Sequence, residues 1–173
     1  DRWNALFRKD GDPARRDALL ARLRQVRSSQ GMDLLNLTDA DGRVILRCAP
    51  NARPGIGERE TDPLVDQVLR TRHACGGTFL LTRERLQREG PDVAGKAAND
   101  GGGMMIGAAV PIFEGHRLVG VLEMGNLLNG SFDKVDRIRD VLFENEQYQG
   151  KPIGTATIFM GDLRISTNVL GED

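Results

Sequence analysis

Two apolar segments joined by a short turn constrain the fold of this chain more than any other feature of its sequence. Residues 104–113 and 118–127 are almost uninterrupted runs of apolar and small side chains, and Glu114-Gly115-His116 lies between them. A connection this short joins antiparallel strands, because parallel strands need a crossover of about a dozen residues or more. The two segments therefore predict a β-hairpin and, with it, an antiparallel sheet.

Two further hairpins are predicted, one on each side of the first. Residues 32–37 and 43–47 flank a turn that ends in Asp41-Gly42, and residues 155–160 and 163–169 flank Gly161-Asp162. Glycine next to aspartate is typical of the tight turns that join paired strands.

A long amphipathic helix is predicted at residues 14–30. Its apolar side chains recur at helical spacing, and they are Leu19, Leu20, Leu23 and Val26. Asp12-Pro13 is typical of a helix start, with Asp12 as the cap. Residues 3–7 look like the end of an earlier helix, which Asp10-Gly11 breaks.

Shorter helices are predicted between the hairpins. One opens at Asp62-Pro63, and another begins after Thr82 and is interrupted by Gly90-Pro91. Residues 133–147 form a third, and we expect its apolar residues Val135, Ile138 and Leu142 to face inward. Helices that connect antiparallel hairpins pack against one sheet, so the expected class is α+β.

The charge balance argues against several classes of partner. The 24 basic and 25 acidic residues leave a formal net charge of −1, whereas nucleic acids and anionic membranes select a basic surface. No segment reaches the roughly 18–20 apolar residues that span a bilayer. The chain begins at Asp1 without a methionine, so we interpret it as a piece of a longer, processed protein.

Cysteine and histidine are scarce. Cys48 and Cys75 leave two interpretations open, one disulfide in an exported protein or two free thiols. Two cysteines and two histidines are too few for a structural zinc site, and His73-Ala74-Cys75 lacks the spacing of covalent haem attachment. We therefore expect neither a metal nor a cofactor.

Catalytic motifs are missing from the sequence. No nucleophile-elbow, zinc-protease or phosphate-loop pattern occurs, and Gly101-Gly102-Gly103 leads into a strand rather than a helix. A hydrolase that uses Glu123 and His73 would need the two side chains to converge in a cleft. We do not expect an enzyme.

Three side chains are candidates for binding a small ligand. Glu123 interrupts an apolar strand, so its carboxylate must be paired in a salt bridge, protonated or part of a ligand site. Arg47 ends the strand at residues 43–47; it either lies in solvent or holds a carboxylate with two hydrogen bonds. His73 follows the helix that Pro63 opens, where a cation also complements the helix dipole.

These segments together resemble a known family of sensor domains. Residues 35–47, the helix at 62–71, residues 103–112 and residues 118–122 are similar to a Cache domain. Cache domains are the PAS-like extracytoplasmic sensors of chemoreceptors and sensor histidine kinases. Residues 154–169 closely resemble a segment of many methyl-accepting chemotaxis receptors and related kinases.

The resemblance implies a domain organisation. A PAS-like Cache fold has an antiparallel sheet of about five strands, a long N-terminal helix and helical connections. Residues 1–30 would form the membrane-proximal helices and residues 31–130 the sensor core. Residues 131–173 would form a helix and a terminal hairpin that begin an incomplete second module, because the family usually has more strands after that hairpin.

The resemblance also implies a function. The chain would be the periplasmic part of an inner-membrane receptor that works as a homodimer through its N-terminal helix. It would bind a small organic acid such as acetate, propionate or pyruvate, with Arg47 and His73 as anion partners. Met105, Ala109 and Glu123 would line the sheet wall, where small residues such as Gly107 and Gly120 either leave space or allow close packing. The alternative is a module that senses a partner protein and has no small ligand.

Overall fold

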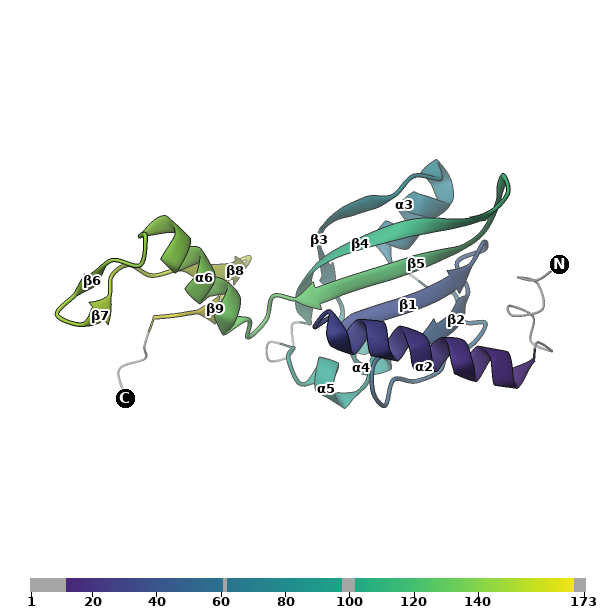
Figure 1. Ribbon diagram of the computed structural model, residues 1–173, viewed down its shortest axis with the longest axis horizontal. Helices are drawn as coiled ribbons and strands as arrows, with labels where there is room; N and C mark the ends of the chain where they lie inside the picture. Colours follow the sequence, from purple (N-terminus) through teal and green to yellow (C-terminus); the bar gives the residue numbers. More distant parts are fainter. Residues whose placement is uncertain (1–11, 61, 98–101, 170–173) are drawn as a thin grey trace.

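A five-stranded antiparallel sheet forms the core of the larger, N-terminal part of the chain (Figure 1). The computed structural model describes residues 12–60, 62–97 and 102–169 of the chain. The strand order is β2-β1-β5-β4-β3. The strands are β1 Leu34–Asp39, β2 Val44–Arg47, β3 Cys75–Leu81, β4 Gly103–Glu114 and β5 Arg117–Leu127. The predicted hairpins β1–β2 and β4–β5 are confirmed, as is the α+β class.

Helix α2, Pro13–Ser29, covers one face of the sheet (Figure 1). The Asp12 side chain accepts a hydrogen bond from the Ala14 amide and caps the helix, as predicted. Leu19, Leu20 and Leu23 pack against a cluster formed by Leu35, Leu37, Ile45, Leu46 and Cys48. The segment at residues 3–7, predicted to be helical, lies outside the described residues.

Three short helices lie on the other face of the sheet. They are α3 Pro63–Thr71, α4 Arg83–Arg88 and α5 Pro91–Ala94. The Asp62 side chain caps α3 by accepting hydrogen bonds from the amides of Leu64 and Val65. The apolar side of α3 packs against Ala109 and Val121 of the sheet. This face therefore lies under a layer made of short helices and loops.

The C-terminal part extends away from the sheet (Figure 1). It contains α6 Phe132–Leu142, β6 Gln147–Tyr148, β7 Lys151–Pro152, β8 Thr157–Met160 and β9 Leu163–Thr167. Strands β8 and β9 form the predicted terminal hairpin. Within the described ranges, no helix has the length and apolar character of a membrane span.

Two predictions about α6 are wrong. The helix ends at Leu142 and not at residue 147, because Glu144 and Asn145 adopt positive φ angles of 51° and 58°. Val135 is buried as expected, but Ile138 and Leu142 are 44% and 69% exposed. The side of α6 that carries Ile138 and Leu142 is not covered by any residue that the structure describes.

Candidate functional site

One row of paired residues crosses the whole sheet. The register aligns Cys75 with Ala109, Ala109 with Glu123, Glu123 with Asn36 and Asn36 with Arg47. Side chains that are directly opposite in neighbouring strands point to the same face. The predicted ligand residues Arg47, Ala109 and Glu123 therefore share one face, and Met105 lies on it four residues before Ala109. This face carries α3.

Arg47 is buried and already paired. Its Nη2 lies 3.0 Å from Glu60 Oε2 and its Nε lies 3.3 Å from Glu89 Oε1. Its Nη1 donates to the Arg53 carbonyl at 3.2 Å. The sheet is thus tied through one guanidinium to the β2–α3 loop and to the end of α4. The alternative of a solvated strand end is wrong, because the side chain is 0% exposed.

Arg85 of α4 is the second guanidinium of this cluster. Its Nε lies 2.8 Å from Glu60 Oε1, its Nη2 lies 3.3 Å from Glu123 Oε2, and its Nη1 contacts Glu89. Asn36 Nδ2 donates to Glu89 Oε1 at 2.9 Å. The salt bridge that was one interpretation of Glu123 is therefore present. We call Arg47, Arg85, Glu60, Asp62, Glu89 and Glu123, together with Asn36, the ionic cluster.

The ionic cluster contains more carboxyl groups than guanidinium groups. All six of its charged side chains are buried, four acids against two arginines. Burial raises the pKa of Glu123 well above its ordinary range; Arg85 opposes the rise, and the hydrogen bond and charge of Asp62 add to it. Asp62 Oδ2 and Glu123 Oε1 otherwise have no hydrogen-bond partner among the described residues. The raised pKa of Glu123 favours the protonated carboxyl group, which has a proton to donate.

The remaining predicted site residues lie in different environments. Met105 and Ala109 are fully buried. His73 is exposed beyond the end of α3, its Nδ1 is 2.7 Å from the Thr71 carbonyl oxygen, and no contact joins it to the ionic cluster. A Cβ on Gly107 or Gly120 would lie 2.7 Å from Met124 O or 2.4 Å from Thr38 O. These glycines therefore allow close approach of neighbouring strands rather than leave space above the sheet.

Four charged members of the ionic cluster were not predicted from the sequence. Glu60, Asp62, Arg85 and Glu89 lie in a loop and around a short helix, where charged residues are usually solvated. Of these four residues, only Asp62 could be singled out from the sequence, because it precedes Pro63 as the cap of a predicted helix. The other three have no periodicity that would separate them from surface charges.

The two cysteines are free thiols. Cys48 packs in the cluster under α2, whereas Cys75 packs beside α3 on the opposite face of the sheet. Burial raises the pKa of the Cys48 thiol to about 11. The disulfide interpretation is therefore excluded by position.

A cavity of about 220 Å³ lies beside α2. Its walls come from α2, from strand β2 and from the loop that follows β2. The lining residues are Arg16, Asp17, Leu20, Arg24, Ile45, Leu46, Arg47, Ala52, Pro54 and Ile56. Arg47 thus belongs both to the ionic cluster and to the wall of this cavity.

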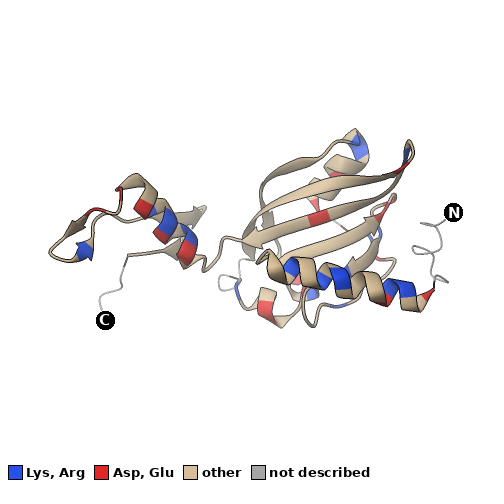
Figure 2. Cartoon of the chain, viewed as in Figure 1, with Lys and Arg blue, Asp and Glu red and all other residues tan. Residues whose placement is uncertain are grey.

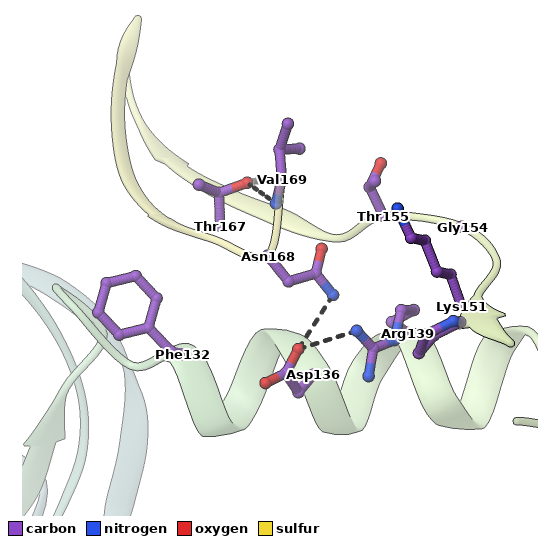
Figure 3. Close-up of a pocket in the computed structure, with 10 residues that line it drawn as sticks. Phe132, Asp136, Arg139, Lys151, Gly154, Thr155, Thr167, Asn168 and Val169 are labelled. Carbon is purple, nitrogen blue, oxygen red and sulfur yellow. Dashed lines mark hydrogen bonds and ion pairs between the residues drawn. The ribbon is translucent and has the colours of Figure 1, made fainter. Parts of the chain in front are cut away.

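A second cavity, of about 680 Å³, lies in the C-terminal part between α6 and the segments around β7 and β9 (Figure 3). Asp136 accepts a hydrogen bond from Asn168 at 3.3 Å and pairs with Arg139 at 3.1 Å. Arg139 also pairs with Asp140 at 2.7 Å, so its charge is balanced within α6. Across the described residues, no group of three or more His, Cys, Asp or Glu side chains is arranged to hold a metal ion.

Comparison with protein families identifies the family of this chain. Residues 5–137 match the family described as the double sensory domain of two-component sensor kinase, dCache_3. The chain belongs to this family. Its sheet with a long N-terminal helix is a Cache fold, and the match ends inside α6. The comparison with curated proteins finds no match.

Family membership assigns a sensory role to the fold just described. The match covers α2, the sheet and the short helices α3 to α5, which include the ionic cluster and the cavity beside α2. Both features connect the sheet to neighbouring segments: α2 on one face and the β2–α3 loop on the other. The chain is a Cache sensory domain of a sensor kinase or receptor.

Proposed function

We propose that this Cache domain is the extracytoplasmic ligand-sensing part of a transmembrane receptor and binds a small organic acid such as acetate. The family description supports a sensor kinase over a chemoreceptor as the output. The observation that carries the proposal is Arg47, a residue in the wall of a cavity whose buried guanidinium is held by two carboxylates. Met105, Ala109 and Glu123 are fully buried on the α3 face of the sheet and do not line this cavity, and His73 stays outside the proposed site.

Ligand binding at Arg47 is coupled to the layer above the sheet. A ligand carboxylate can form the same two-point contact with a guanidinium that a glutamate forms. Binding therefore displaces Glu60 or Glu89 from Arg47, and each displacement releases the segment that carries the glutamate. The released segment is the β2–α3 loop or the end of α4, and its shift is the first step of signalling.

Calorimetric titration of the 173-residue chain with acetate, propionate and pyruvate tests this proposal. Glu89→Gln removes a competing carboxylate, so we expect affinity for the bound acid to rise about tenfold, equivalent to about 1.4 kcal/mol. Arg47→Gln combined with Glu89→Gln removes the anchor and its partner together, and we expect binding to be lost. The double change removes one buried charge of each sign, whereas Arg47→Gln alone would increase the excess of buried acids.

The control is Arg53→Gln, which removes an exposed guanidinium paired with Glu58 at 2.6 Å. Surface pairs of this kind contribute little, so affinity should stay unchanged. A folded chain that binds none of the acids would refute the proposal. That result would favour the second candidate, a module that senses a partner protein, for which the exposed apolar residues Phe132, Val141 and Leu142 provide a surface.

Two further features belong to the same proposal. Residues 131–173 begin a second module, which agrees with the word "double" in the family description and with the uncovered apolar side of α6. The receptor works as a homodimer in which α2 of one protomer lies beside α2 of its partner. A shift of α2 against the sheet then changes the spacing of the two helices.

A further inference from the structure

The two edges of the five-stranded sheet differ in how they are protected. Strand β2 forms one edge, and the loop after it returns along its outer side. There the Val44 amide donates to the Glu58 carbonyl oxygen at 2.8 Å, and the Gly57 amide donates to the Val44 carbonyl oxygen at 2.8 Å. Strand β3 forms the other edge, and among the described residues β4 is the only segment that pairs with it. The outer backbone groups of β3 are therefore not used by any described segment.

Strand β3 also lacks the features that usually keep an edge strand from pairing. Natural edge strands are short, charged, interrupted by proline, bent by a bulge or covered by another segment. Strand β3, Cys75–Leu81, has seven residues and no charged residue or proline (Figure 2), and it pairs with β4 in continuous register without a bulge. Gly76, Gly77 and Thr78 are exposed, so no large side chain shields the backbone there. This edge has the character of a pairing surface.

The sequence of β3 is complementary to itself in antiparallel orientation. Full overlap of two copies places Thr78 opposite Thr78, because Thr78 is the middle residue of the strand. Gly77 then lies opposite Phe79, and Gly76 lies opposite Leu80. Each glycine thus receives a large side chain of the other copy, and aromatic side chains stabilise strand glycines by covering them. Leu80 is 64% exposed in the single chain, and this pairing brings its side chain against the other copy.

We propose that β3 is an interaction surface for a second copy of this chain, which adds its own β3 in antiparallel orientation and joins the two sheets into one continuous sheet. Both copies contribute the same residues, as a twofold interface requires. The pairing is independent of the proposed ligand site, because Arg47 and the cavity beside α2 lie at the β2 edge. It also leaves α2 available for the proposed homodimer, since α2 covers a face of the sheet and β3 forms an edge.

Cysteine cross-linking of the 173-residue chain tests the register directly. Thr78→Cys, in a chain that also carries Cys75→Ala, places two thiols opposite each other, where paired Cα atoms lie about 4.5–5.5 Å apart and a disulfide fits. Oxidation by copper phenanthroline should therefore produce a covalent dimer. Ile106→Cys is the matched control, because Ile106 pairs with Thr78 and its two copies would lie three strand spacings, or about 14 Å, apart. It should cross-link at least about tenfold more slowly, since this separation exceeds the reach of a disulfide. Cys48 is fully buried and stays in both variants.

A charge at the same position tests the pairing without covalent chemistry. Thr78→Lys places like charges directly opposite each other, which destabilises a strand pair, so the dimer dissociation constant from analytical ultracentrifugation should rise at least about tenfold. Ile106→Lys puts the same charge on the same face, but its copies are farther apart than the screening length of about 8 Å at physiological salt, so its dissociation constant should stay within a few-fold of wild type. Circular dichroism of both variants confirms the fold, because both side chains are exposed.

The pairing is refuted if the folded chain stays monomeric at concentrations up to about 1 mM, where even a weak association is detected. It is also refuted if Thr78→Cys and Ile106→Cys cross-link at equal rates, or if Thr78→Lys leaves the dissociation constant unchanged. Dissociation caused by Ile106→Lys alone would show that two copies meet through their sheet faces instead of their edges. None of these results affects the proposed acid binding, which the calorimetric titration tests separately.

Discussion

At the scale of single residues, Glu123 decides the charge state of the sheet face. Its carboxyl group is 0% exposed and contacts Arg85, yet the remaining acids of the ionic cluster outnumber the guanidinium groups. Sequence reasoning identified Glu123 and Arg47 because each stands beside or within an apolar strand. It did not identify Glu60, Arg85 or Glu89, because burial of a charged residue in a loop or short helix depends on tertiary packing that leaves no local pattern.

The raised pKa of Glu123 predicts a pH dependence of stability. The folded state holds this proton more tightly than the unfolded chain, so the stabilisation is complete below the ordinary carboxyl range and is lost as pH rises toward the folded-state pKa. Glu123→Gln cannot ionise and should remove this part of the slope, which is at most about 1.4 kcal/mol per pH unit. Urea unfolding of wild type and variant from about pH 5 to pH 8 measures it.

The matched control for this prediction is Glu58→Gln, which removes a carboxylate in an exposed pair with Arg53. Its unfolding free energy should keep the wild-type dependence on pH. If Glu123→Gln and wild type show the same slope across this range, Glu123 is ionised in the folded protein and the raised pKa is wrong.

At the scale of elements, every strand of the sheet was predicted except the edge strand β3. The hairpins β1–β2 and β4–β5 follow from apolar runs and turn residues. Strand β3 was missed because Gly76 and Gly77 interrupt it and most of its side chains are exposed, so it shows no apolar alternation. It forms because β4 offers an unpaired edge over seven residues, which is a tertiary effect. The inward face of α6 was mispredicted for the same reason, since periodicity does not say whether a partner layer is present.

A pair of aligned glycines tests the packing of this edge. Gly77 of β3 lies opposite Gly107 of β4. A Cβ on Gly107 would lie 2.7 Å from the Met124 carbonyl oxygen, whereas a Cβ on Gly77 would meet nothing within 4 Å. Gly107→Ala should therefore reduce the free energy of unfolding by about 1–3 kcal/mol. Gly77→Ala should leave it unchanged or raise it by about 0.4–1 kcal/mol, because it restricts the unfolded chain. Thermal denaturation of both variants gives the comparison, and equal losses would contradict the close approach of β4 and β5.

At the scale of the whole molecule, the sequence was sufficient for the α+β class, the N-terminal helix and the Cache family. It did not predict which charged residues meet, because Arg47 and Glu123 are far apart in the chain and are linked only through Arg85 and Glu89 of the α4 segment. Nor did it locate the cavity beside α2, which depends on how the helix lies across β2. The resulting sensor has an acid-rich cluster on one face of its sheet and a basic cavity on the other.

The central claim, that this Cache domain senses a small organic acid, is tested most directly by a nuclear magnetic resonance titration of the ¹⁵N-labelled chain. We predict that acetate, or a longer carboxylate, produces saturable shifts of amide signals in the first half of α2 and around Arg47. The corresponding alcohols should produce none. A well-dispersed spectrum of folded protein in which no carboxylate causes a saturable shift would contradict the claim.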